Sequence, residues 1–371
     1  MAMPKFPDAD KKPKNWKDSL YGTTPVFLTI VATVLAGLSS GEMTRAQYYR
    51  SMAAQHQAKA ADQWGFFQAK RLRATEAQST LDLLHAASHP SQMDPATLGG
   101  ASQRLAQAMA TAASEPSLAR KLQPLADKSA ALDRDLQATL NDPASASAFA
   151  APESAWGSLQ DQGISDKDIL SAMNAINAHQ SEAAMAPLLK RITGKAMADS
   201  HGVIDANTEA LDRVSKGPGA VLDKLHGIFS GQCDLASEAV RVVSLAPLGG
   251  DRPSTSQGAN PIVLAQREID AAFADIAAAR FRYAAARYER EARYNSMTGQ
   301  LCEVEVHQTS VTSERHRTRS AQFFYGMLAA QAGVTIATLA LAVQRRSIFW
   351  SFGAAAGIAA IGFSAYVYLL M

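Results

Sequence analysis

The pair of residues whose spacing is most typical of a metal site is His85 and His89, in the segment HAASHP. Histidines four residues apart on a helix face the same side, as two zinc ligands do. The glutamate of an HExxH motif and a third ligand are missing, and Pro90 ends the helix at this point. A polar helix end is therefore the favoured interpretation, and no metal ligand is assigned.

Other catalytic signatures are equally incomplete. The segment ITGKAMADS has a Gly-Lys pair but lacks the upstream glycine and the following Ser or Thr of a phosphate-binding loop, and no GxSxG occurs. Cys233 and Cys302 have no CxxC companion, which excludes zinc binding by cysteine. They form either one disulfide in an oxidising compartment or, the favoured alternative, two unpaired half-buried thiols. We predict no catalytic residue and no cofactor, and hence no enzyme.

Composition indicates an all-α fold. The chain has 371 residues, a net charge of +2 and 19% charged residues, which argues against a strongly basic nucleic-acid-binding protein. Alanine dominates its apolar residues, and alanine favours closely packed helices. No run of alternating β-branched and polar residues predicts a strand.

Three charge-free segments are long enough to cross a bilayer as helices, at residues 20–41, 320–344 and 347–371. The last two predict a hairpin with Arg345 and Arg346 at its turn and Trp350 at interface depth. The first segment follows a lysine-rich tail at residues 1–19. It is interpreted as a retained anchor rather than as a cleaved signal peptide, because the helical pattern continues after Ser40.

The predicted spans contain no Asp, Glu, Lys, Arg or His, which argues against an ion-coupled carrier. They contain many small residues, among them Gly333, Gly353 and Gly357. Small residues let helices approach closely in lipid, within the hairpin or between protomers, although alanine bias alone also accounts for them. These glycines are the predicted helix-packing residues.

Lysine and arginine counts suggest the orientation of the spans. The tail and the hairpin turn, which must share one side, are both basic and are therefore expected to be cytoplasmic. Residues 42–319 would then be periplasmic or extracellular, although Arg45, Arg50, Arg315, Arg317 and Arg319 flank that region. The expected location is a bacterial inner membrane.

Apolar heptads predict two long stalk helices between the spans. A series from Ile262 through Ile269 and Ile276 to Val311 fills residues 261–319, with Gly299 as a candidate kink, and a series from Ala46 to Leu81 fills residues 42–88. These helices are expected to pair as an antiparallel, coiled-coil-like stalk. Residues 89–260 form a predicted helical cap, with loops at NDPASASAFAAPES and LAPLGGDRPSTSQGANP. Its expected helices are Ala96–Ala113, Pro116–Leu140, Ser165–Ile192, Ile204–Lys216 and Ala220–Val243.

The segment QAKAADQWGFFQAKRLR resembles a motif of the bacterial membrane proteins called domain of unknown function 4337. That family has an N-terminal span, a QAxxxDQWxxYQAKxxR motif and a C-terminal two-span hairpin. The hairpin of this chain resembles the family's, but the stretch from about residue 90 to 260 does not. Phe67 replaces the expected tyrosine. The matching motif residues are Gln57, Ala58, Asp62, Gln63, Trp64, Phe67, Gln68, Ala69, Lys70 and Arg73.

Within this motif the heptad places Phe67 in the stalk seam and Trp64 beside it, with Lys70, Arg71 and Arg73 on solvated faces. The resemblance implies three spans and brings no activity. The function predicted is therefore a membrane-anchored helical scaffold or interaction protein, and the alternative is an oligomeric channel or transport-accessory subunit. The expected partners are the lipid bilayer, an unknown protein and a second copy of the chain, and no nucleic acid.

Overall fold

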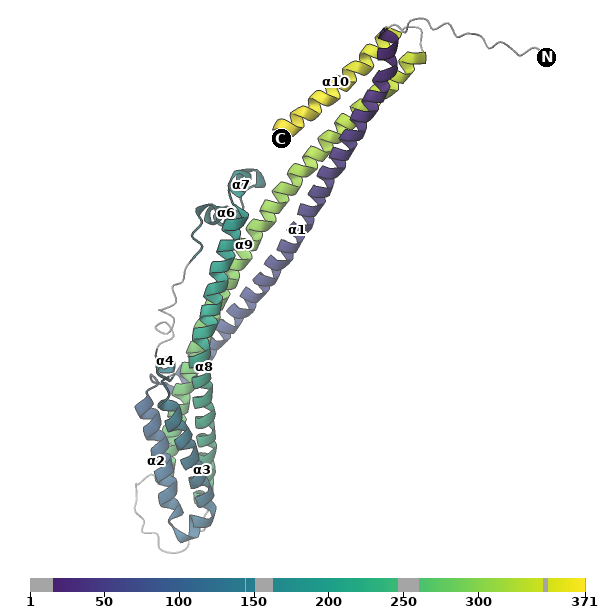
Figure 1. Cartoon of the computed structure of the whole chain (residues 1–371). Coiled ribbons are helices and arrows are strands. Elements are labelled where there is room, and N and C mark those ends of the chain that lie inside the picture. Colours follow the sequence, from purple (N-terminus) through teal and green to yellow (C-terminus); the bar gives the residue numbers. More distant parts are fainter. Residues whose placement is uncertain (1–15, 144, 151–162, 246–259, 343–345, 371) are drawn as a thin grey trace, which may run out of the picture. The chain divides into compact units, whose positions relative to one another are not determined.

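The computed structural model describes residues 16–143, 145–150, 163–245, 260–342 and 346–370, and in these ranges all regular structure is helical (Figure 1). The all-α prediction is confirmed. The basic tail before Trp16, most of the second predicted loop and Arg345 lie outside the described residues. The helices are α1 (Trp16–Ser88), α2 (Pro95–Ala113), α3 (Pro116–Leu140), α4 (Ser145–Phe149), α6 (Lys167–Asn177), α7 (Glu182–Leu189), α8 (Gly194–Ser244), α9 (Pro261–Ala342) and α10 (Arg346–Leu370).

The chain divides into two compact units, which we describe separately. The anchor unit contains Met1–Lys59, Ser171–Ile192 and Cys302–Met371, and the bundle unit contains Ala60–Leu170 and Thr193–Leu301. Both α1 and α9 contribute a part to each unit. Three of the described helices are long and apolar enough to cross a membrane, namely α1, α9 and α10.

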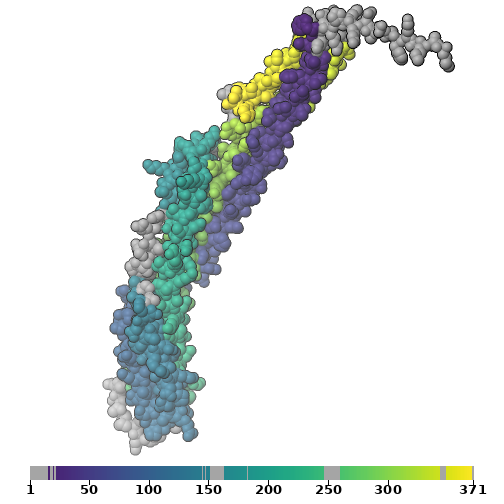
Figure 2. Space-filling view, viewed as in Figure 1, coloured from purple at the N-terminus to yellow at the C-terminus, as the bar shows by residue number. Residues whose placement is uncertain are grey.

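In the anchor unit, the apolar parts of α1, α9 and α10 pack around a small core of Ala32, Leu35, Phe323, Ala330, Ala360 and Val367. The indole Nε1 of Trp350 donates to Thr24 Oγ1 at 2.9 Å and ties the start of α10 to α1. The outer faces of α1 and α10, purple and yellow in Figure 2, carry exposed apolar side chains such as Phe27, Ile30 and Ile358. An apolar outer surface around a thin core is what lipid as the surrounding solvent requires.

The bundle unit has a conventional apolar core. Helix α2 starts at Pro95 after Asp94, whose carboxylate accepts from the backbone N–H of Thr97 and caps the helix. Phe229 of α8 is fully buried, together with Leu98 and Leu105 of α2 and Leu122 and Leu136 of α3. Helices α2, α3 and α8 therefore share one interior.

The helix predicted at Ser165–Ile192 is wrong, because the structure has two helices there. Helix α6 ends at Asn177 and His179 takes a positive φ of 52°. The N–H groups of Gln180 and His179 donate to the carbonyls of Ala175 and Ile176, which satisfies the last carbonyls of the helix. Glycine usually fills this left-handed position, and its absence hid the helix end in the sequence.

The break predicted between Lys216 and Ala220 is also wrong, because α8 runs through Pro218. Pro218 is buried, and the hydroxyl of Tyr283 donates to the carbonyl of Ser215 at 3.2 Å, in the turn before the proline. A buried tyrosine thus lies beside the interior proline, and the helix continues despite the intrahelical hydrogen bond that the proline removes. The predicted loop NDPASASAFAAPES likewise contains the short helix α4.

Candidate functional site

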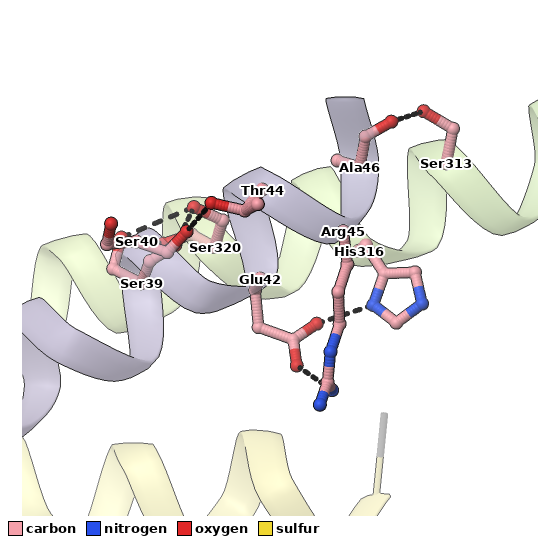
Figure 3. Close-up of polar contacts among 9 residues, drawn as sticks. All are labelled: Ser39, Ser40, Glu42, Thr44, Arg45, Ala46, Ser313, His316 and Ser320. Atoms are coloured by element: carbon pink, nitrogen blue, oxygen red, sulfur yellow. Dashed lines mark hydrogen bonds and ion pairs between the residues drawn. The ribbon is translucent and has the colours of Figure 1, made fainter. Parts of the chain in front are cut away.

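The most distinctive polar feature of the anchor unit begins with a pair of serines, one on α1 and one on α9. The Ser39 hydroxyl donates to the carbonyl of Ser320 at 2.9 Å, and the Ser320 hydroxyl donates to the carbonyl of Ser39 at 2.8 Å (Figure 3). Ser320 is almost completely buried. The small side chains allow the two backbones to approach closely, and the reciprocal bonds fix their register.

One turn further along α1, a carboxylate and a histidine meet across the seam. His316 Nδ1 lies 2.6 Å from Glu42 Oε2, and both side chains are more than four-fifths buried. The second oxygen of Glu42 accepts from Arg45 at 3.1 Å, as Figure 3 shows. The ring of Tyr49 stacks on the imidazole at a centroid distance of 5.4 Å. The buried carboxylate of Glu42 therefore has a hydrogen-bonding partner on each of its two oxygens.

The same seam continues with alternating polar contacts. Ser313 donates to the carbonyl of Ala46 at 2.8 Å, and His56 Nδ1 lies 2.7 Å from Glu305 Oε2. The α1 residues rise in number from 39 to 56 while their α9 partners fall from 320 to 305, so the helices are antiparallel here. We call residues 39–56 and 305–320 the polar seam. Its contacts can position helices and exchange protons, and they carry no arrangement of a nucleophile with a base.

The α1 side of the polar seam retains the alanines of the predicted heptad. Ala46, whose carbonyl accepts from Ser313 of α9, is buried, and so are Ala53 and Ala60. Glu42, His316, Ser39 and Ser320 were not predicted from the sequence, because apolar periodicity gives no sign of polar residues at a helix interface. The alanine face of α1 was the one feature of the sequence that could have located these residues, because it marks the side of α1 on which α9 packs.

In the bundle unit, the aromatic residues of the family motif pack against α9. The Trp64 indole covers Gly299, where an added Cβ would lie 3.3 Å from Trp64 Cε2, and the rings of Trp64 and Phe67 meet edge to face. Gly299 is buried and lies within helix α9, which continues on both sides of it. Glycine is needed here for the close approach of an indole.

One basic residue of the motif, Lys70, is less solvated than expected, whereas Arg71 and Arg73 are exposed. Lys70 forms an ion pair with Glu291 and lies over the ring of Tyr288, and only 28% of its side chain is exposed. Lys70, which was predicted to lie on a solvated face, is therefore mostly buried against α9. Arg73 is exposed and lies over the same ring, at 5.9 Å from its centroid. The remaining polar motif residues, Gln57, Asp62 and Gln68, are exposed, and Gln63 is half-buried beside Gly299.

The predicted helix-packing glycines lie at contacts between helices of the anchor unit. A Cβ added to Gly333 would lie 3.1 Å from the carbonyl oxygen of Gly353, and the reverse distance is also 3.1 Å. A Cβ on Gly357 would lie 2.2 Å from Leu28 Cδ2 on α1. All three glycines are used inside one chain, so they no longer argue for an oligomer.

Both cysteines are free thiols in this structure. Burial raises the pKa of the Cys233 thiol to about 12, and the Asp270 carboxylate adds to the shift. Burial likewise raises the pKa of Cys302, with Glu305 contributing. A thiol held protonated is a poor nucleophile. His85 lies in the last turn of α1, while His89 lies beyond the helix at a positive φ of 44°, so the two do not share a helix face.

The fold and the seam define an all-α protein with three helices able to cross a membrane. Residues 22–150 match the family model described as Domain of unknown function (DUF4337). The resemblance to this family is therefore confirmed over these residues, which include the first apolar segment and the motif. The match also includes α2, α3 and α4, a stretch in which no resemblance was predicted. Helices α9 and α10 lie outside the matched range. No curated protein and no solved structure matches the chain.

Proposed function

We propose that this protein is a membrane-anchored helical scaffold without catalytic activity. The observation that carries the proposal is the continuity of α1 and α9, each of which leaves a charge-free segment and continues as an unbroken helix into the bundle unit. Helices that contain a charge-free segment and also form part of a folded unit tether that unit to a bilayer. Such a device serves to present a surface.

The presented surface belongs to the bundle unit. Leu72 and Leu83 are about 70% exposed, and their spacing of eleven residues places them on one face of α1. Phe66 is also exposed, beside Lys70 and Asp212 in a shallow groove of about 310 Å³. Exposed leucines repeated on one face of a helix suit a protein partner, either an unknown protein or a second copy of this chain.

The location proposed is a bacterial inner membrane with a cytoplasmic N-terminus and a retained first span. The lysine-rich tail supports the orientation. The reciprocal bonds of Ser39 support retention, because cleavage there would cut α1 within its contact to Ser320. A cysteine introduced at Leu83 should react with a membrane-impermeant maleimide in intact spheroplasts, and protection until lysis would reverse the orientation.

Site-specific photo-cross-linking in living cells tests the scaffold function. A photoreactive phenylalanine analogue at Leu72 or Leu83 should give one discrete adduct that disappears when the identified partner is deleted, or a chain dimer. The matched control is Leu369, which is 78% exposed on α10 and should give lipid adducts only. Absence of any protein adduct from the α1 positions, together with ion conductance of the purified protein in liposomes, would favour the channel alternative.

A further inference from the structure

A groove of the anchor unit lies where the apolar parts of α1 and α9 become polar. It holds about 430 Å³ and has two chemically different walls. Hydroxyl and amide groups come from Ser40, Thr44 and Gln47 of α1, and apolar groups come from Met43 of α1 and from Phe324 and Met327 of α9. A ligand that fits both walls must itself be amphipathic.

The level of this groove coincides with a membrane boundary. The charge-free segments begin or end at Gly41 and Ser320, and the Ser39–Ser320 bonds hold these two points side by side. Exposed tyrosines gather at the same end of the spans, with Tyr325 on α9 and Tyr366 and Tyr368 on α10. Helix α10 is aligned by Gly326, where an added Cβ would lie 3.0 Å from Ser364 Oγ. Tyrosine belts mark the headgroup depth of a bilayer.

Two arginines continue the groove on its polar side. Arg50 follows Gln47 by three residues and Met43 by seven, and Arg317 precedes Ser320 by three and Phe324 by seven, so helical periodicity places both on the groove-facing sides. Both are exposed. Arg317 has a contact of 3.5 Å to Glu314, in which both side chains are about two-thirds exposed, and such a pair holds an arginine only weakly.

The acidic neighbours leave a positive excess at this level. Glu42 is already bound by His316 and Arg45 in the polar seam, and Glu314 faces Arg317. Arg45 projects from the other side of α1, because residues two apart, such as Arg45 and Gln47, point about 200° apart around a helix. The groove therefore has its own pair of cations, distinct from the arginine of the seam.

From this arrangement we propose that the groove binds the glycerophosphate region of one anionic phospholipid. The phosphate lies between Arg50 and Arg317, whose guanidinium groups recognise phosphate oxygens through paired N–H donors. The hydroxyls of Ser40 and Thr44 face the glycerol and ester oxygens. The acyl chains follow Met43, Phe324 and Met327 along the spans. This inference is independent of the scaffold function.

The test is lipid retention by the full-length protein purified in a mild detergent and examined by native mass spectrometry. The protein is incubated with phosphatidylglycerol or with phosphatidylcholine of the same chains. We expect one phosphatidylglycerol bound in preference to phosphatidylcholine. The variants Arg50→Gln and Arg317→Gln should each weaken retention about fivefold, and the double variant roughly thirtyfold. Ser40→Trp, which fills the groove and leaves both arginines in place, should abolish retention.

The control variant is Arg45→Gln, which removes an arginine at the same membrane depth from the other face of α1. It should retain the lipid at the parent level. If Arg45→Gln lost as much lipid as the groove variants, the binding would be due to diffuse surface charge and the proposed groove site would be wrong. If the protein retained the two lipids equally, the proposed recognition of the phosphate charge would be wrong. Displacement of the lipid by millimolar inorganic phosphate would show a phosphate site without lipid. Circular dichroism and gel filtration of each variant show that the fold is intact.

Discussion

The anchor unit and the bundle unit hold their helices together by different chemistry. Most of the largest fully buried side chains in the described residues lie in the bundle unit, including Phe229, Leu105 and Leu122. The anchor unit instead joins α1 to α9 through alanines and the polar seam. Burial of large apolar groups supplies most of the free energy of folding in water, but offers no such gain between helices already surrounded by lipid. Within the spans, small side chains therefore specify the contact, whereas the polar seam lies mostly beyond the charge-free segments and specifies it through hydrogen bonds.

The largest effect should come from the bundle core. Phe229→Ala removes a ring with no exposed surface, and we expect a loss of about 3–5 kcal/mol in the free energy of unfolding. Hydrogen exchange of α3 and α8 amides in the full chain measures it, with the exposed Leu83→Ala as a control of similar chemistry. If Phe229→Ala lowered the free energy of unfolding by less than Leu83→Ala, the bundle unit would not depend on burial of large apolar side chains, and the contrast with the anchor unit would fail.

The next effect concerns the glycine contacts of the spans. Gly357→Leu forces a side chain into Leu28, where an added Cβ alone would come within 2.2 Å, so the three-helix packing should loosen and the melting temperature in detergent should fall. Gly362→Leu on the same helix is the matched control, because nothing lies within 4 Å of its added Cβ. Equal melting temperatures for the two variants would mean that α10 does not pack through Gly357.

The polar seam should respond more modestly. A double-mutant cycle of Glu42→Gln and His316→Gln should give a coupling of about 1.5–3 kcal/mol, since a hydrogen bond to a charged group is worth about that much. The exposed pair Glu314 and Arg317 should give a coupling of about 0–1 kcal/mol. Chemical denaturation in detergent provides both values. Similar couplings for the two pairs would argue that burial adds nothing to the seam.

The smallest effect is a pH dependence within the bundle unit. Burial lowers the pKa of His226, which packs on Phe273 at a centroid distance of 4.9 Å, and nearby Arg280 lowers it further. The folded state therefore binds a proton less readily than the unfolded state, so stability is present above the ordinary histidine pKa of about 6.5 and declines as pH falls below it. His226→Gln should flatten the melting-temperature profile between about pH 7 and pH 5. A profile unchanged in slope would show that His226 is not the titrating group.

The sequence predicted those features that depend on local pattern. Apolar periodicity identified the buried faces of α1 and α9, and Pro261 with Asn260 marked a helix start, where the Asn260 side chain accepts from the N–H of Ile262. Features that depend on tertiary partners were missed. Helix α8 continues through Pro218 with Tyr283 bound to the adjacent turn, and Trp64 covers Gly299; in both cases the partner is distant in sequence. Glu42 and His316 are 274 residues apart, and nothing local connects them.

The reciprocal serine bonds have a mechanical consequence for any signal that passes along the anchor unit. Sliding α1 against α9 by one helical turn would displace the backbones by about 5.4 Å and break both bonds, which are 2.8 and 2.9 Å long. The serine pair therefore fixes the axial register of the two helices and resists a piston movement of either one by a full turn.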